Sequence, residues 1–330
     1  MTAPLDVSGS ALEGRPEAAA EGQGRVIEGR SLTRIAWNRL KRDRVAMAGG
    51  ITVIFLILVA IFSPVIVSTI GHPPLQFNSH LIDPTTLTPK GAFGGISWEH
   101  PFGVEPVNGR DIFSRIVAGA WISLLIGFLA TLLSVIIGTI MGVTAGYFGG
   151  WVDNVIGRIM DVFLAFPLLV FAIALAGVIP NEGFGLSGNA LRIALLIFII
   201  GFFNWPYIGR IIRGQTLSLR EREFVDAARS LGARHGYIIF REILPNLMAP
   251  ILVYATLLIP TNILFEAALS FLGVGINPPT PTWGGMLSEA VRFYTQPHFV
   301  LFPGLAIFIT VLAFNLFGDG LRDAFDPRTR

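Results

Sequence analysis

The side chains that could perform enzymatic chemistry are few and scattered in this sequence. A phosphate-binding P-loop requires a Gly-Lys pair followed by Ser or Thr, so that the lysine reaches the β- and γ-phosphates of a nucleotide. The chain contains only two lysines, Lys41 and Lys90, which follow Leu40 and Pro89. The sequence therefore excludes a P-loop, and any ATP hydrolysis that drives this protein must belong to a partner.

Other catalytic and metal-binding signatures are also missing from the sequence. There is no cysteine, which excludes disulfides and thiolate metal sites. The sequence contains no HExxH or GxSxG motif, and no long apolar stretch carries a pair of carboxylates. No metal-ligand spacing joins the five histidines, which are His72, His80, His100, His235 and His298. We therefore expect a protein that is not an enzyme and has no metal and no cofactor.

One carboxylate does lie inside a long apolar stretch. Glu266 belongs to the sequence LFEAALSF, and a carboxylate at membrane depth is costly enough to mark either a transport pathway or a structural ion pair. Arg292, in the next polar segment, is a candidate partner. A structural hydrogen bond or ion pair is favoured over contact with a substrate, and both interpretations stay open at this point.

Composition assigns the chain to a membrane. Hydrophobic residues make up 52% and charged residues 14% of the sequence, whereas soluble domains contain about 25% charged residues. The net charge of +2 gives no reason to expect nucleic-acid binding. A bilayer is spanned by about 20 apolar residues, and six stretches qualify: Val45–Ile70, Trp121–Tyr147, Met160–Ile179, Ile193–Ile211, Leu247–Leu272 and Phe299–Phe317. We predict an all-α integral membrane protein with six transmembrane helices in the cell membrane.

Basic residues predict the orientation, because lysine and arginine gather on the cytoplasmic side of membrane proteins. Arg34, Arg39 and Lys41 precede the first span, which places the N-terminus in the cytoplasm, and six crossings return the C-terminus there. The expected segments are a disordered cytoplasmic tail (1–30), an amphipathic surface helix or basic anchor (31–44), the first transmembrane helix (45–70), an extracytoplasmic segment (71–114), a core with five transmembrane helices (115–319) that includes a cytoplasmic loop (212–246), and a cytoplasmic tail (320–330).

The cytoplasmic loop contains the longest charge-rich segment between two apolar stretches. Four apolar residues in it have the i, i+3, i+4, i+7 spacing of one helix face: Phe224, Ala227, Ala228 and Leu231. Gly232 follows directly, where the end of a helix favours a residue that can adopt positive φ. The pattern predicts a short helix whose narrow apolar face contacts a partner outside the membrane.

A ridge of small residues marks the second predicted span. Gly138, Gly142 and Gly146 recur at intervals of four, which places them on one face of a helix. Because glycine has no side chain, such a ridge lets another helix approach closely. A chance cluster of glycines is the alternative, and close helix packing is the favoured interpretation.

The charged segment resembles the EAA loop in permease subunits of binding-protein-dependent ABC importers, whose pattern is E-A-A-x3-G-x9-I-x-L-P. Asp226 replaces the glutamate, which shortens the side chain, and Glu242 stands at the isoleucine position. The apolar face and the glycine are kept. The resemblance implies that this loop couples the protein to an ATPase, through the residues Phe224, Asp226, Ala227, Ala228, Leu231, Gly232, Leu244 and Pro245.

Further segments narrow the resemblance to the C-type permeases of oligopeptide, dipeptide and nickel importers. The segments are His100–Gly103 and Asn108–Arg115 in the outer loop, Glu266–Gly273 at the end of the fifth span, and Asn315–Asp323 with Asp326–Arg328 near the C-terminus. One departure is visible, since Val104-Glu105 stands where the outer-loop pattern has Thr-Asp. The resemblance runs from Ser31 to Arg328.

The resemblance implies a type I ABC importer permease fold and a set of partners. Two homologous permeases would form the pathway, two cytoplasmic ATPases would each receive one coupling helix, and an extracytoplasmic binding protein would deliver a peptide. Nickel, glutathione and antimicrobial peptides are alternative substrates. From the residues alone, a stand-alone channel, a proton-coupled carrier that uses Glu266, and a subunit that only tethers ATPases also stay open.

Overall fold

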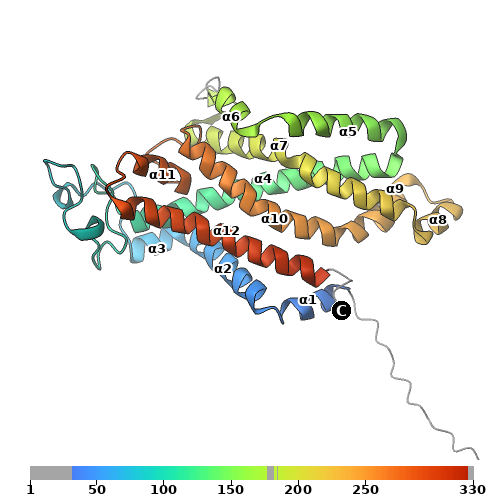
Figure 1. Cartoon of the computed structure of the whole chain (residues 1–330), viewed down its shortest axis with the longest axis horizontal. Coiled ribbons are helices and arrows are strands. Elements are labelled where there is room, and N and C mark those ends of the chain that lie inside the picture. Colours follow the sequence, from blue (N-terminus) through green and yellow to red (C-terminus); the bar gives the residue numbers. More distant parts are fainter. Residues whose placement is uncertain (1–31, 177–181, 184, 326–330) are drawn as a thin grey trace, which may run out of the picture.

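The computed structural model describes residues 32–176, 182–183 and 185–325, which form an elongated bundle of helices (Figure 1). Within them five helices are long and apolar enough to cross a membrane: α2 (Arg44–Ile61), α4 (Ile112–Phe148), α7 (Gly188–Arg220), α10 (Leu244–Phe271) and α12 (Pro297–Phe325). The bent pair α5 (Gly150–Ala165) and α6 (Leu168–Ala176) gives a sixth crossing if it is one span. The predicted all-α fold is confirmed. The predicted tail 1–30, the end of the tail 320–330 and the end of the third span lie outside the described residues.

The third span differs from its prediction. α5 ends at Ala165, and α6 continues from Leu168 after a bend of 75°, so the single helix expected over Met160–Ile179 is not formed. Phe166 is extended (φ −78°, ψ 125°), because the ring of Pro167 disfavours a helical backbone in the residue before it. Pro167 also lacks the N–H that would continue the helical hydrogen bonds. Pro167 therefore breaks the span, although it does not interrupt the apolar stretch on which the prediction was based.

The first span is also divided into two helices. α2 ends at Ile61, and α3 (Ser63–Thr69) follows with Pro64 in its first turn, where the missing N–H of proline costs nothing. The two helices meet at Phe62, whose backbone is not helical. The predicted transmembrane helix 45–70 is therefore a long helix followed by a short one.

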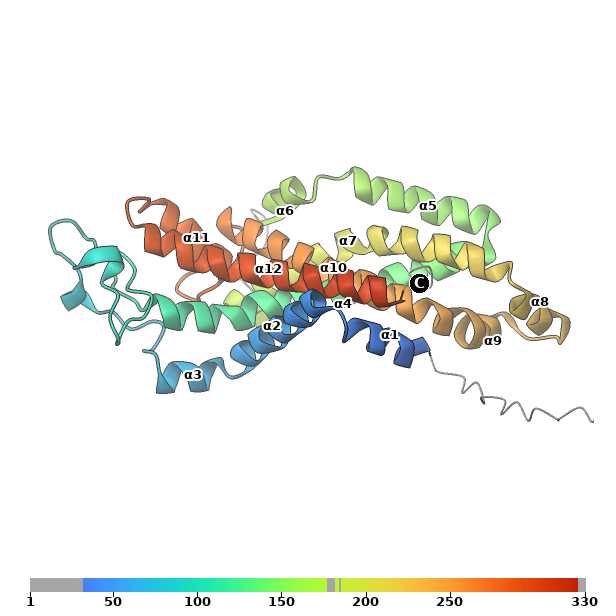
Figure 2. The same ribbon diagram turned by 60° about the horizontal axis from the view of Figure 1, so that its bottom comes forward.

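The segment predicted to be a surface helix contains α1 (Leu32–Leu40), which packs against the end of α12 (Figure 2). The place of α1 on a membrane surface stays a prediction. Its buried Ala36 and Leu40 contact a small apolar cluster that also contains Ala46 and Ala324. The basic side chains of an amphipathic helix can then face headgroups, while its apolar face is covered by protein. α1 therefore covers the last turns of α12 at this end of the bundle.

The predicted glycine ridge of α4 lies directly against α7. At Gly142 an added Cβ atom would lie 2.6 Å from the carbonyl oxygen of Gly209, and at Gly138 and Gly146 the nearest α7 atoms would be 2.8 and 2.7 Å away. Real Cβ contacts are essentially never shorter than 3.0 Å, so only glycine fits between these helices. Ser134 adds a hydrogen bond of 2.8 Å to a carbonyl oxygen of α7.

The two ends of the bundle differ in content (Figures 1 and 2). One end carries the predicted extracytoplasmic segment, which is mostly loop with two short turns, η1 (Ser79–Leu81) and η2 (Ala92–Gly94), and it also carries α11 (Trp283–Val291). The other end carries α8 (Glu223–Ser230) and α9 (His235–Tyr237). A two-residue hairpin, β1 (Glu182–Gly183) and β2 (Leu186–Ser187), connects α6 with α7. This separation agrees with the sidedness that the basic residues predict, and the orientation stays a prediction.

The α4–α7 contact predicts a specific packing defect. Gly142→Ala places a methyl group against the backbone of α7, and overpacking of this kind costs about 1–3 kcal/mol. Gly214→Ala is the matched control, since a Cβ atom there meets nothing within 4 Å and alanine favours a helix more than glycine does. Thermal unfolding in detergent should show a lower midpoint for Gly142→Ala and no decrease for Gly214→Ala. Equal midpoints would contradict the close contact.

Candidate functional site

The charged segment folds into α8, a short helix that follows α7 at one end of the bundle (Figure 1). Val225 is fully buried in an apolar cluster that includes Ile212 of α7 and Ile238 of η3 (Ile238–Ile243). Ala228, one turn later, is half-buried against the same cluster. These two side chains attach α8 to the bundle.

This orientation divides the apolar face that the sequence predicts. Phe224, Ala227 and Leu231 face outward, with exposed fractions of 38% for Phe224 and 88% for Leu231. Ala228 lies at the border, half-buried against the bundle. The sequence-based reasoning did not single out Val225, although its i, i+3 spacing to Ala228 indicates a second helix face. Exposed apolar side chains within a charged segment are typical of a protein-binding surface.

The end of α8 depends on Gly232. Its φ of +78° lies in the left-handed region, where a residue with a Cβ atom is strained. The N–H of Gly232 donates to the carbonyl oxygen of Arg229 at 2.9 Å, and the N–H of Ala233 donates to that of Ala228 at 3.0 Å. This pair of bonds is the Schellman arrangement, and it turns the chain back toward α9.

The outward face of α8 borders a hollow of about 830 Å³. Its apolar wall includes Phe224, Ala227, Ala228, Leu231 and Tyr237. Leu244 is half-buried in the cluster beneath, and Pro245 lies exposed in the first turn of α10. The residues predicted to contact a partner therefore comprise an outward group beside a hollow and a second group that anchors and turns the chain. Their role in partner contact stays a prediction.

Polar contacts connect the segment around α8 to the neighbouring helices. Arg213 of α7 binds Asp153 of α5, with Nη2 2.6 Å from Oδ2. Arg220, the last residue of α7, donates to the carbonyl oxygen of Gly146 at 3.1 Å. Tyr147 of α4 and His235 of α9 form a hydrogen bond of 2.9 Å. These contacts join the end of α7 and the start of α9 to two other helices, α4 and α5.

Glu266 is fully buried in α10, and its partner is a serine. The hydroxyl of Ser270 donates to Oε1 of Glu266 at 2.7 Å. Arg292 is exposed just after α11, and no ion pair joins it to Glu266 in the part of the chain that the structure describes. The structure therefore contains the hydrogen bond that the sequence allows and lacks the ion pair. A pathway role for Glu266 stays a prediction.

A largely buried cluster of four charges, which the sequence-based reasoning missed, joins the outer segment to α4 and α11. Arg115 lies 3.0 Å from Oε2 of Glu289 and 3.3 Å from Oε2 of Glu105, and Arg110 binds both carboxylates. Burial raises the pKa of Glu105, and the charges of Arg115 and Arg110 oppose this shift. Two arginines close together in the outer-loop motif, Arg110 and Arg115, were the sequence feature that could have indicated this cluster. The cluster holds this outer end together.

Folding also brings two histidines of the outer segment together. His72, His100 and Asp111 each offer one ligand atom, and these atoms lie within 4.8 Å of one another. Nδ1 of His100 is hydrogen-bonded to Oδ1 of Asp111 at 2.9 Å, while Oδ2 of Asp111 accepts from the N–H of Ser114 and so caps α4. The cluster has the residue types of a metal site, and the expectation of no metal stays a prediction.

Comparison with known proteins identifies the family. The model of the binding-protein-dependent transport system inner membrane component matches residues 134–330, and that of the N-terminal TM domain of oligopeptide transport permease C matches residues 31–83. The chain is 43% identical over 298 residues to the dipeptide transport system permease protein DppC of Alkalihalophilus pseudofirmus, with 90% of each chain covered. It is 44% identical over 295 residues to the glutathione transport system permease protein GsiD of Escherichia coli O6:K15:H31, with 89% of this chain and 90% of that one covered.

The fold is similar to that of a solved ABC transporter. An inward-facing structure of the MetNI methionine ABC transporter gives a TM-score of 0.52 at 18% identity, covering 64% of this chain and 97% of that chain. This likeness supports the type I permease fold. Together with the family match, it fits the helices, the charged loop and the missing P-loop. The chain belongs to the binding-protein-dependent transport system inner membrane components, the non-catalytic, multi-pass permease subunits of ABC importers in the inner membrane.

Proposed function

We propose that this chain is the C-type permease of an ATP-driven importer of peptides, and that a homologous second permease completes the pathway. Two cytoplasmic ATPases supply the energy, and an extracytoplasmic binding protein delivers the substrate. The observation that carries the proposal is α8, a short helix whose apolar outward face borders a hollow while Val225 anchors it in the bundle.

The two faces of α8 have complementary tasks in this proposal. Phe224, Ala227 and Leu231 enter a groove on the ATPase, where burial of their apolar surface stabilises the contact. Val225 and Ala228 transfer movement of the ATPase to α7 and η3, because a close-packed interior transmits displacement. ATP-driven closure of the ATPases then moves α8 and tilts the spans, and the pathway changes the side to which it is open.

Peptides are favoured over nickel as the substrate. The names of both relatives describe transport of amide-linked molecules, a dipeptide and glutathione. Among the described residues, no histidine or charged side chain lines the hollows beside α7 and α10, although a nickel ion prefers imidazole and similar ligands. Neutral surfaces that can form hydrogen bonds suit a peptide better.

Reconstitution in vesicles tests the proposed function. The complex of both permeases, the ATPases and the binding protein should take up radiolabelled alanyl-alanine or glutathione only when ATP is supplied. The purified chain alone should take up neither. Uptake by the chain alone that is abolished by Glu266→Gln would contradict the proposal and indicate a proton-coupled carrier.

Substitution of Leu231 tests the coupling surface. Leu231→Asp places a charge on the outward face without disturbing the bundle, since the side chain is almost fully exposed. Loss of an apolar anchor should weaken ATPase binding by about 2 kcal/mol, roughly thirtyfold. Co-purification of the ATPases should fall accordingly. Tyr294→Asp, an equally exposed position at the other end of the bundle, should retain them. ATPase retention by Leu231→Asp would show that the helix docks through another face.

The turn at Gly232 gives an independent test of coupling. Alanine in the left-handed region costs about 1–2 kcal/mol, a factor of roughly 5–30 in the population of the native turn. Gly232→Ala should therefore lower the uptake per ATP hydrolysed, and Gly232→Asn should restore most of it because asparagine tolerates positive φ. Gly236→Ala is the control, since its added Cβ atom meets nothing within 4 Å. Equal coupling in all three variants would contradict a role for the turn.

A further inference from the structure

A chain of amide and hydroxyl side chains crosses the apolar bundle near the middle of its helices. Nδ2 of Asn204 (α7) donates to Oδ1 of Asn262 (α10) at 2.8 Å, and Nδ2 of Asn262 donates to the hydroxyl of Thr131 (α4) at 2.9 Å. The Thr131 hydroxyl donates in turn to the carbonyl oxygen of Gly127 at 2.7 Å. All three side chains are buried, so this polar chain fixes their rotamers.

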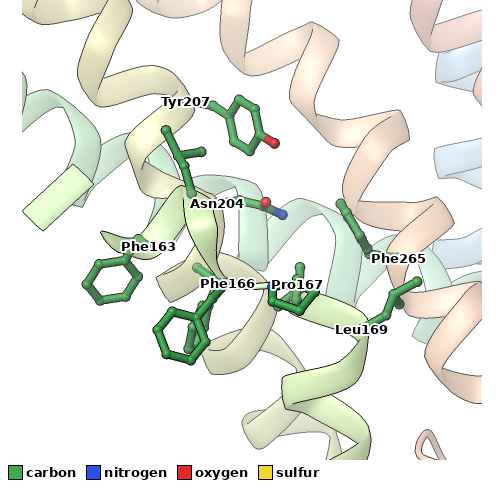
Figure 3. A pocket seen from close by; sticks show the side chains of 10 residues that line it. Phe163, Phe166, Pro167, Leu169, Asn204, Tyr207 and Phe265 are labelled. Atoms are coloured by element: carbon green, nitrogen blue, oxygen red, sulfur yellow. The ribbon is translucent and has the colours of Figure 1, made fainter. Parts of the chain in front are cut away.

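The order of donors determines which atom of Asn204 is left over. The Thr131 hydroxyl uses its only hydrogen on Gly127, so it must accept from the NH₂ group of Asn262. The Asn262 oxygen must then accept from Asn204. Oδ1 of Asn204 therefore remains as an acceptor, and in the described part of the chain no donor reaches it. Figure 3 shows this amide directed toward the space between Tyr207 and Phe265.

That space is a groove between α7, α10 and the break in the third span. Two adjoining hollows of about 310 and 340 Å³ share Asn204, Tyr207 and Phe265. Small-molecule sites begin at about 300 Å³. Phe166 and Pro167 form one wall (Figure 3), and α10 contributes further side chains on the other. The groove is open along its length rather than enclosed by this chain alone.

The groove is unsuited to lipid tails. Tyr207 is 57% exposed, and its hydroxyl has no hydrogen-bond partner among the described residues. An unsatisfied polar group in hydrocarbon costs several kcal/mol. The break at Phe166-Pro167 adds to this, because α5 ends there and Pro167 has no N–H with which to continue its hydrogen bonds. Irregular backbone at membrane depth is tolerated only where protein or water covers it. A polar occupant must therefore face this side of α7.

We propose that this groove is the part of the transport pathway that binds the backbone of the peptide in transit. Oδ1 of Asn204 accepts a hydrogen bond from a peptide N–H, and the hydroxyl of Tyr207, one turn further on the same face of α7, donates to a peptide carbonyl. Phe166 and Phe265 contact side chains without selecting a charge. This assignment rests on the proposed function, and it specifies the surface along which the peptide moves.

The absence of cysteine from the sequence allows a direct test in the reconstituted complex. Tyr207→Cys and Thr261→Cys place thiols on the two walls of the groove, and Phe198→Cys places a thiol on the opposite face of α7, where the native side chain is also exposed. A membrane-impermeant, charged methanethiosulfonate should label the two groove positions at least tenfold faster than the Phe198→Cys control. Binding protein loaded with alanyl-alanine or glutathione, together with ATP, should slow labelling of the groove positions only.

The outcomes separate this inference from the proposed function. Labelling of both groove positions as slow as at the control would overturn the inference, because the groove would then be covered by lipid or by the second permease. Fast labelling without protection, in a complex that takes up the probe peptide, would also overturn it. A complex that takes up neither peptide contradicts the proposed function itself, whatever the labelling rates are.

A subtler variant tests the hydrogen bond from Tyr207. Tyr207→Phe removes one hydroxyl and leaves the shape of the groove unchanged. With saturating loaded binding protein, uptake should fall about three- to tenfold, the effect of one hydrogen bond, while stimulation of ATP hydrolysis by the binding protein should be retained. Tyr294→Phe, the same change on an exposed residue outside the spans, should leave uptake unchanged. Equal uptake by both variants would remove Tyr207 from the pathway.

Discussion

The close contact between α4 and α7 is the constraint on which the other helices of the bundle depend. Glycines at three successive turns of α4 bring the two backbones together, and side chains any larger would push α7 away. α7 in turn positions α5, because Gly209 lies against the end of Met160, and its last residues lead directly into α8. The break of the third span and the helix α8 therefore have their places fixed by one helix pair.

The cost of unpaired polar groups explains where polarity occurs in this bundle. Ion pairs gather at its ends, as in the cluster of Glu105, Arg110, Arg115 and Glu289 and in the pair of Asp153 and Arg213. Between the ends, the amide of Asn204 donates one hydrogen bond to that of Asn262. The groove beside Asn204 and Tyr207 is where polar atoms of the described spans remain available to an occupant. The available polar atoms of Asn204 and Tyr207, rather than its volume, distinguish this groove from the other hollows in the spans.

Hydropathy predicted the positions of α7, α10 and α12, because a span needs only length and an apolar composition. It could not locate the breaks at Phe62 and Phe166, since the local backbone conformation of a helix break has no hydropathy signal. The orientation of α8 was missed for another reason: tertiary packing, not the strongest apolar pattern, selected Val225 as the buried residue. Glu289 lies 174 residues from Arg115, and a single sequence does not indicate which distant charges meet.

The proposed groove and α8 are connected through continuous helices. α7 carries Asn204 and Tyr207 and leads into α8, while the turn at Gly232 leads back through α9 and η3 to α10, which carries Asn262. Both walls of the groove are thus attached to opposite ends of the segment that contains α8. The hydrogen bond between Asn204 and Asn262 holds these walls together near their middle. In the proposed function, a displacement of α8 would rotate the walls about this bond instead of separating them, so that one side of the groove would widen while the other narrowed. Transport from one side of the membrane to the other requires this kind of motion around a fixed binding site.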